Sequence, residues 1–188
     1  DTHTIVYIHN TPAIVDAVRL QQFDIGIVSR SPPYLGVHSL YQTEVNYVAL
    51  VPQNHSLAAS KDRLDLREVA GREEFITFGN VYPLEMQGMD EDLAAQFQNK
   101  ARYSVANVLA ATALVRAVGV PALVDPFSAR MSASAGGMVV RPIQQKLTYH
   151  IGIITRGIEV MNRETRQLAD ALISKFEADP LIVAAGQS

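Results

Sequence analysis

The sequence predicts an α/β fold made of two Rossmann-like lobes. Two stretches that lie far apart in the chain repeat one order of elements: a helix, a turn and a short all-apolar strand. The first runs from Pro12 to Val28, and the second from Val105 to Pro126. Strands without polar alternation are typical of βαβ units, in which helices cover both faces of a sheet. Because such sheets bind ligands where strand ends meet helix starts, the two units also indicate where a site would form.

Composition limits the classes of protein to consider. The chain has 188 residues, of which 48% are apolar and 19% charged, so it can bury the core of one large or two small domains. The net charge is −3 and no basic run occurs, which argues against nucleic-acid binding by this segment itself. The absence of cysteine excludes disulfides and fits a reducing compartment. No apolar run approaches the roughly 20 residues of a membrane span.

The N-terminal part supplies the first lobe. Thr4–Ile8 is rich in β-branched residues and predicts a strand. Asn10 or Thr11 followed by Pro12 is typical of a helix start. The apolar strand Asp24–Val28 follows. The next residues, SRSPPYLG, contain two prolines and a glycine, and they predict a loop that approaches a lobe boundary.

The middle of the chain predicts the second lobe. A strand over Glu44–Pro52 is followed by a short helix over Asp65–Val69 and a strand over Glu74–Phe78. After a helix around Leu93–Phe97, Ser104 is expected to cap a long amphipathic helix. The remaining elements are a strand at Ala101–Tyr103, a helix at Ser128–Ala135, strands at Met138–Ile143 and Leu147–Thr155, and a terminal helix at Asn162–Ala178 with Leu168, Leu172, Ile173 and Phe176 inward.

These elements predict two lobes joined by two crossover segments. Lobe I is assembled from residues 1–42 and 154–188, and lobe II spans residues 43–153. The prolines between residues 31 and 36 mark the exit from lobe I, and the terminal helix is expected to pack back on it. Two crossings make a hinge, and the cleft between the lobes is then a natural ligand site.

Four segments carry a resemblance to a known family. They are QQFDIGIV at residues 21–28, YVALVPQNHSLA at 47–58, LVRAVGVPALVDP at 114–126 and SAGGMVVRPI at 134–143. The second resembles a P-x-x-H-P-L-A turn, with Ser56 where proline is usual. Together the segments resemble the effector-binding domain of LysR-type transcriptional regulators, whose fold is similar to type II periplasmic binding proteins.

The resemblance implies a ligand-sensing domain of a cytoplasmic transcription regulator that works as a homodimer or tetramer. It implies a small-molecule effector, a carboxylate or an amino acid, in the interlobe cleft. DNA binding would belong to a winged helix-turn-helix upstream of Asp1. One further strand and helix of lobe I, with part of the ligand site, would also precede Thr4 and be missing here.

The candidate effector-binding residues lie at helix starts and strand ends, where free N–H groups bind carboxylates. For most of them a plain capping role is the alternative. Asp125, for example, is explained by capping alone, although it could also receive a ligand ammonium group. The predicted set consists of Asn10, Thr11, Ser29, Arg30, Gly79, Asn80, Ser104, Asn107 and Asp125.

Other kinds of site have little support in the sequence. The five histidines are scattered without metal-ligand spacing, so we expect neither a metal nor a cofactor. No nucleophile elbow, Walker loop or dinucleotide fingerprint occurs, and an enzyme is therefore disfavoured. The acids at residues 90–92 are better explained as a solvated helix face. The alternative function that stays open is a solute-binding protein of a transporter.

Overall fold

The computed structural model describes residues 3–29, 33–59, 62–78 and 88–185. The chain divides into two compact units. Unit 1 comprises Asp1–Glu44 and His150–Ser188, and unit 2 comprises Val45–Tyr149. The chain passes from one unit to the other twice, within strand β2 (His38–Asn46) and within strand β6 (Thr148–Thr155). Each unit contains its own three-stranded sheet.

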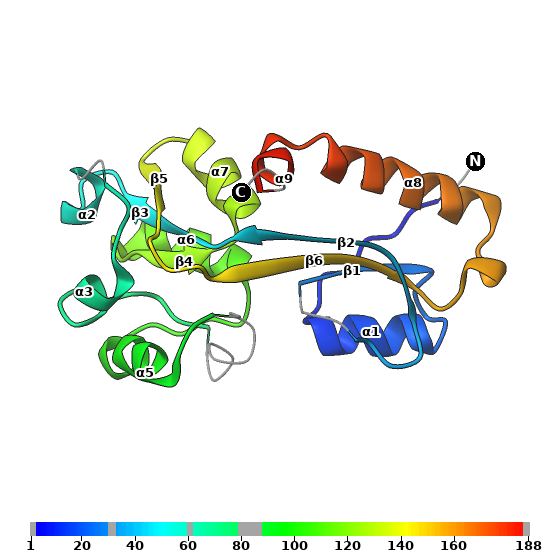
Figure 1. Cartoon of the computed structure of the whole chain (residues 1–188), viewed down its shortest axis with the longest axis horizontal. Coiled ribbons are helices and arrows are strands. Elements are labelled where there is room, and N and C mark those ends of the chain that lie inside the picture. Colours follow the sequence, from blue (N-terminus) through cyan, green and yellow to red (C-terminus); the bar gives the residue numbers. More distant parts are fainter. Residues whose placement is uncertain (1–2, 30–32, 60–61, 79–87, 186–188) are drawn as a thin grey trace. The chain divides into compact units, whose positions relative to one another are not determined.

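The sheet of unit 1 has the strand order β1-β6-β2. Strand β1 (Ile25–Val28) runs antiparallel to β6, with Val28 opposite Gly152. Figure 1 shows helix α1 along one side of this sheet and helix α8 along the other. The helices of unit 1 are α1 (Thr11–Arg19), the short 3-10 helix η2 (Ile158–Val160), α8 (Arg163–Glu177) and α9 (Pro180–Ala185).

Local chemistry sets both ends of α1. The side chain of Asn10 accepts a hydrogen bond from the N–H of Ala13 at 3.0 Å, and proline occupies the first turn, which confirms the predicted helix start. The helix ends where Gln21 adopts a left-handed conformation with φ 58°. Gln22 N–H then bonds back to the carbonyl of Ala17 at 2.8 Å, which closes the last turn.

A small apolar cluster holds α1 against the sheet. Its fully covered members are Val18 from the helix, Val28 from β1 and Ile154 from β6. Gly26 lies directly under the helix. A Cβ atom added there would lie 2.5 Å from Cγ2 of Ile14, which is far inside contact distance. The missing side chain therefore allows α1 to approach β1 closely.

The sheet of unit 2 has the order β4-β3-β5, and both ladders are antiparallel. Three isolated parallel bridges extend it: Leu64 with Ile143, Ile76 with Ala122, and Thr77 with Ser104. The elements of unit 2 are β3 (Val48–Pro52), α2 (Ser56–Ala59), α3 (Leu66–Ala70), α5 (Glu91–Lys100), α6 (Val108–Val118), β4 (Ala122–Val124), α7 (Pro126–Ser134) and β5 (Met138–Pro142).

Strand β3 is apolar on both faces because each face carries its own core. Ala49 and Val51 belong to a cluster that contains Phe75 and Phe97, whereas Leu50 belongs to a second cluster with residues of α6 and α7. The two phenyl rings pack edge to face, with centroids 5.0 Å apart. A sheet covered on both faces explains the continuous apolar run, and the predicted α/β fold class is confirmed.

The predicted strand Thr4–Ile8 is wrong. The segment is not a strand, and Ile5, Val6, Tyr7 and Ile8 are each more than half exposed. An extended segment becomes a strand only when a neighbouring strand takes up its N–H and C=O groups. Among the described strands of unit 1, the sheet order leaves no strand paired with it.

Other element predictions also need correction. Ala101–Tyr103 is not a strand, and in Glu74–Phe78 only Ile76 and Thr77 form isolated bridges. The predicted strand Glu44–Pro52 is interrupted at Tyr47, where β2 ends and β3 begins after one residue. On α8, the most buried residues are Thr165 and Ala169, whereas Leu168 is 39% exposed. The apolar periodicity predicted that large side chains face inward. The buried positions of α8 instead carry the small side chains of Thr165 and Ala169.

An ion pair between Arg102 and Glu74 links two segments of unit 2. The guanidinium of Arg102 donates from Nε to Glu74 Oε2 at 2.9 Å, and the backbone N–H of Arg102 donates to Glu74 Oε1 at 3.0 Å. These hydrogen bonds favour the ionised carboxylate, so the pKa of Glu74 is lowered. The pair therefore ties the segment before Ile76 to the residues that precede α6.

We predict that Gly26→Ala destabilises the protein by about 1–3 kcal/mol, because overpacking forces neighbouring atoms to move. The added Cβ would meet Cγ2 of Ile14 at 2.5 Å and Cγ2 of Val18 at 3.1 Å. Urea unfolding followed by circular dichroism measures the change. Gly71→Ala is the matched control, since no atom lies within 4 Å of its added Cβ and its φ is −73°. Equal stability of both variants would contradict the close approach of α1.

We predict that Glu74→Gln makes the protein less stable at neutral pH. The folded-state pKa of Glu74 is lowered, so the stabilisation is present above the ordinary carboxyl pKa of about 4.3 and is lost as pH falls through the folded value. Wild type and variant should therefore converge in melting temperature in acid. Thermal melts between neutral and acidic pH test this, with the exposed Glu177→Gln as control. A pH-independent difference would refute it.

Candidate functional site: the start of α1 and the end of β1

Two predicted site residues come together in unit 1. Thr11 is the first residue of α1, and Ser29 follows the last residue of β1. The backbone N–H of Ser29 donates to Thr11 Oγ1 at 3.3 Å, and the two hydroxyl oxygens lie 3.4 Å apart. Thr11 is only 6% exposed. The close packing of α1 on β1 thus places a helix start beside a strand end.

The groups at this point are neutral hydrogen-bond donors. The N–H groups in the first turn of a helix have no partner within the helix, and they carry a partial positive charge. Asn10 takes up one of them through Ala13 N–H. Thr11 Oγ1 accepts from Ser29 N–H and lies 3.4 Å from Ser29 Oγ, so either hydroxyl can donate to the other or to a bound acceptor. An oxygen-rich anion such as a carboxylate suits this set of donors.

The predicted residues of unit 2 have structural roles of their own. Asn107 caps α6 by accepting the N–H of Ala110 at 2.9 Å, and Asp125 caps α7 by accepting the N–H of Ser128 at 2.8 Å. The prediction that Asp125 caps its helix is confirmed. The prediction that Ser104 caps the long helix is wrong, because that helix begins at Val108 and Ser104 forms a bridge with Thr77.

The remaining three candidates, Arg30, Gly79 and Asn80, lie outside the described residues. Thr11 and Ser29 are therefore the pair of predicted residues for which the described part of the chain gives a direct contact. Asn10 stays beside them as the cap of α1.

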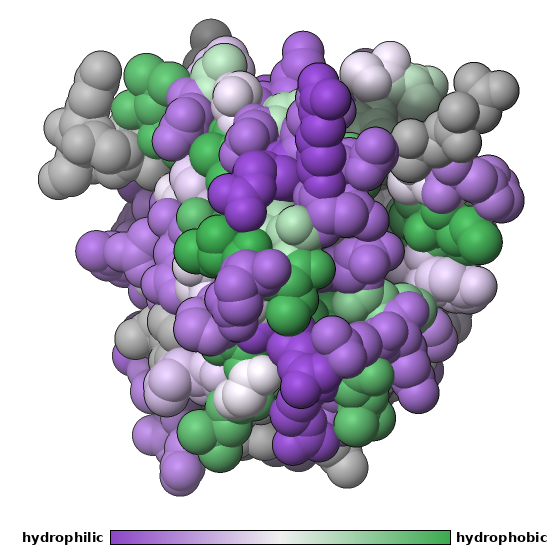
Figure 2. Space-filling model, turned by 90° about the vertical axis from the view of Figure 1, so that its right-hand side faces the viewer, coloured by the Kyte–Doolittle hydropathy of each residue, from purple (hydrophilic) through white to green (hydrophobic). Residues whose placement is uncertain are grey.

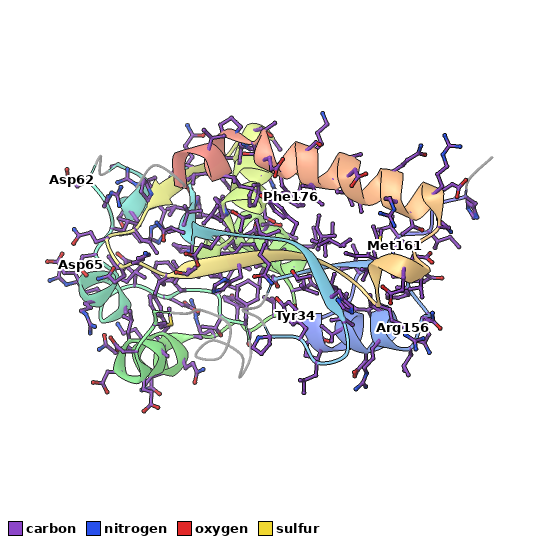
Figure 3. All side chains as sticks on the ribbon, turned by 45° about the vertical axis from the view of Figure 1, so that its right-hand side comes forward. Tyr34, Asp62, Asp65, Arg156, Met161 and Phe176 are labelled. Carbon is purple, nitrogen blue, oxygen red and sulfur yellow. The ribbon has the colours of Figure 1, made fainter. Side chains whose placement is uncertain are left out.

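Sequence reasoning missed Tyr34, whose hydroxyl end lies beside Gly152, the β6 residue opposite Val28. Tyr34 packs against the cluster of Val18, Val28 and Ile154. Figure 3 labels it near the end of α1 at which the helix begins. The sequence signals around it, two prolines and a glycine, predict only an irregular loop. The one signal in the sequence that could have drawn attention to Tyr34 is that it is a tyrosine in the loop that follows a strand end.

The lowered pKa values of carboxyl groups in unit 2 have structural causes. Three carboxyl groups of unit 2, those of Asp65, Glu74 and Asp90, have a lowered pKa. A hydrogen bond from Gln145 lowers the pKa of Asp65, the backbone N–H of Leu93 lowers that of Asp90, and Arg102 lowers that of Glu74. Asp65 and Asp90 cap helices, and Glu74 forms an ion pair with Arg102, so structural roles explain all three lowered pKa values.

Two kinds of feature have no candidate in the described ranges: a metal-binding cluster and a membrane-spanning helix. No group of three or more His, Asp or Glu side chains there could hold a metal ion. No helix among residues 3–29, 33–59, 62–78 and 88–185 is long and apolar enough to cross a membrane.

Comparison with known proteins identifies the family. The family model for the LysR substrate binding domain matches residues 2–177. No curated protein sequence matches the chain. Many solved structures match this chain. The three described next are 13–18% identical to it, so the likeness shows a shared fold alone.

Three of these structures illustrate the likeness. The effector-binding domain of QuiR in complex with shikimate is 18% identical and has a TM-score of 0.62, with 89% of this chain and 78% of that chain covered. The MetR regulatory domain from N. meningitidis, in a double-mutant form, is 18% identical with a TM-score of 0.63 and coverages of 89% and 79%. The Synechocystis CcmR regulatory domain in complex with 2-PG is 13% identical with a TM-score of 0.65 and coverages of 88% and 79%.

The family match extends over nearly the whole chain, and the α/β units agree in fold with regulatory domains of this kind. The chain therefore belongs to the LysR substrate-binding domain family, the effector-binding domains of LysR-type transcriptional regulators.

Proposed function

We propose that this domain senses a small carboxylate-bearing metabolite, an organic acid or an amino acid, for a LysR-type transcription regulator. The observation that carries the proposal is the contact between Thr11 and Ser29 at the start of α1. It places the buried hydroxyl of Thr11 and the half-buried hydroxyl of Ser29 beside helix N–H groups at one end of a sheet, where α/β folds bind ligands. The regulator would act in the cytoplasm, without a cofactor and without enzymatic activity.

The donor set supports the ligand class. Hydroxyl and backbone N–H groups can bind a carboxylate without a dedicated lysine, which suits a chain with no basic run. Two structures of similar fold point the same way: QuiR is in complex with shikimate, which is a hydroxylated carboxylate, and CcmR is in complex with 2-PG. We extend this kind of ligand to the present domain as part of the proposal.

We propose that the effector lies in the cleft between the lobes, with side chains from both. Asn107 and Asp125 would contact it from helix starts in addition to their capping roles. The full proposed set adds Asn10, Arg30, Gly79, Asn80 and Ser104 to Thr11, Ser29, Asn107 and Asp125.

Signal transfer requires that the effector bind one arrangement of the protein more tightly than another, because equal affinity shifts nothing. We propose that effector binding changes the lobe angle or the packing of a homodimer or tetramer. That change would alter how a winged helix-turn-helix domain of the same protein sits on DNA.

A solute-binding protein of a transporter is the second candidate, since the same lobes suit either role. The four family segments and the family match favour the regulator. A helix-turn-helix in the intact protein would exclude the transporter role, and a signal peptide there would support it.

We predict that Thr11→Val weakens binding of a carboxylate effector about fivefold, because one hydrogen bond is worth about 1 kcal/mol. Shikimate is the first ligand to test, by calorimetry. Thr11→Ser keeps the hydroxyl and should bind like wild type. Thr112→Ala, in α6 of unit 2, is the control, because its hydroxyl donates to the Leu109 carbonyl within its own helix. Unchanged affinity in Thr11→Val would refute the role of Thr11.

We predict that Asn107→Ala weakens effector binding by more than its effect on stability explains. The substitution removes a helix cap, which costs about 1 kcal/mol. Asn162→Ala removes the equivalent cap of α8 and is the matched control. Affinity and urea stability are measured for both variants. If both lose stability and neither loses affinity, Asn107 is only a cap.

We predict that the domain pairs with a second copy of itself, as the family resemblance implies. No continuous apolar stripe marks an interface on the face shown in Figure 2, where apolar side chains form small areas among hydrophilic ones. Sedimentation velocity at several concentrations measures the association. A monomer at all concentrations for the intact protein would contradict the prediction.

A further inference from the structure

The two strands by which the chain passes between the units are neighbours. Strands β2 and β6 pair in the sheet of unit 1, and Figure 1 shows them as two long arrows next to each other. In β2 the boundary between the units falls after Glu44, and in β6 it falls before His150. Both passages therefore belong to one pair of hydrogen-bonded strands.

Contacts on both sides of the boundary keep these strands in one register. On the side of unit 1, Oε2 of Glu44 lies 3.7 Å from Nδ1 of His150. On the side of unit 2, the backbone N–H of Tyr47 donates to the carbonyl of Leu147 at 2.8 Å. Tyr47 lies three residues after Glu44. Leu147 lies three residues before His150, so a single antiparallel register continues across the boundary.

A pair of aromatic rings reinforces this register in unit 2. The rings of Tyr47 and Tyr149 meet edge to face, with centroids 5.2 Å apart and an interplanar angle of 87°. Tyr47 is buried in the core cluster that contains Phe75 and Phe97, and Tyr149 packs against the same cluster. Cross-strand aromatic pairs stabilise neighbouring strands beyond the area that they bury. The ring pair thus anchors both crossing strands in one core.

A hydrogen-bonded ribbon of two strands restricts the motions of the parts that it joins. Bending and twisting out of the plane of the ribbon preserve its ladder of hydrogen bonds. Sliding of one strand along the other breaks that ladder and turns side chains to the wrong face. Two separate loops would impose neither restriction.

We propose that residues 44–47 and 147–150 form a single semi-rigid joint between the units, and that the ring pair of Tyr47 with Tyr149 sets its stiffness. The joint lets the units bend and twist but opposes sliding of the two strands. This inference goes beyond the proposed function, because it depends on no particular ligand. It supplies what signal transfer requires, a small number of arrangements among which a ligand can discriminate.

Distances between two spin labels, one in each unit, test the proposal. The chain has no cysteine, so Gln98→Cys in α5 and Gln167→Cys in α8 place the labels at exposed positions. Pulsed electron paramagnetic resonance on this labelled parent protein measures the distribution of the label-to-label distance, which should be single and narrow. Adding Tyr149→Leu, which removes the ring and keeps an apolar side chain, should broaden the distribution. Tyr149→Phe keeps the ring and should keep the parent width.

Tyr41→Leu is the matched control, because the Tyr41 ring stacks on Phe176 within unit 1, with centroids 6.0 Å apart. It should leave the width unchanged. Circular dichroism checks that each variant folds. If Tyr149→Leu does not fold, Tyr149→Met takes its place, since methionine fills irregular gaps without restoring the ring.

Three results would overturn the proposal. The first is a parent protein with several separated distances, which would mean that the ribbon does not restrict the units. The second is an unchanged width in Tyr149→Leu. The third is equal broadening in Tyr149→Leu and in either Tyr149→Phe or Tyr41→Leu, because the ring pair would then have no special part. The measurement uses no effector, so its failure leaves the proposed function standing.

Discussion

The close approach of α1 to β1 is the constraint on which the candidate site depends. Gly26 allows it, since any side chain there would collide with Ile14. The helix then packs along the strand through Val18 and Val28, so that the first residue of the helix reaches the end of the strand. Thr11 and Ser29 are 18 residues apart in sequence, and only this packing brings their hydroxyl oxygens within 3.4 Å. The site is thus a consequence of the core beneath it.

The two units differ in how much core supports them. Unit 2 buries two clusters, one on each face of β3, whereas the cluster under α1 in unit 1 has Val18, Val28 and Ile154 as its buried members. Ile151, Ile153 and Ala169 are also buried in unit 1. Few buried contacts are typical of regions that open at low free-energy cost. A ligand bound at Thr11 and Ser29 would therefore stabilise the packing of α1 on β1, which has a small core of its own.

Sequence reasoning succeeded where local chemistry decides structure. The starts of α1 and α7 follow from Asn10 with Pro12 and from Asp125 with Pro126, since capping depends on neighbouring residues. It failed where a distant partner decides: Thr4–Ile8 has strand composition but no paired strand among the described residues. The contact between Thr11 and Ser29 could be expected, because α/β folds bring the ends of strands close to the starts of helices. Tyr34 could not, because its position depends on the space that Gly152 leaves in another strand.

Neutral donors also set the strength of binding that such a site can reach. Each hydrogen bond to a carboxylate contributes about 1 kcal/mol net, or about 1.5–3 kcal/mol where the ligand charge assists it. Three or four such bonds contribute about 3–12 kcal/mol, and the cost of immobilising the ligand is at least about 4 kcal/mol, so the affinity is about micromolar at the tightest. Metabolites are sensed at such concentrations, and the ligand must also leave when its level falls. A site that relies on Thr11, Ser29 and helix N–H groups is therefore suited to reversible sensing rather than to permanent capture.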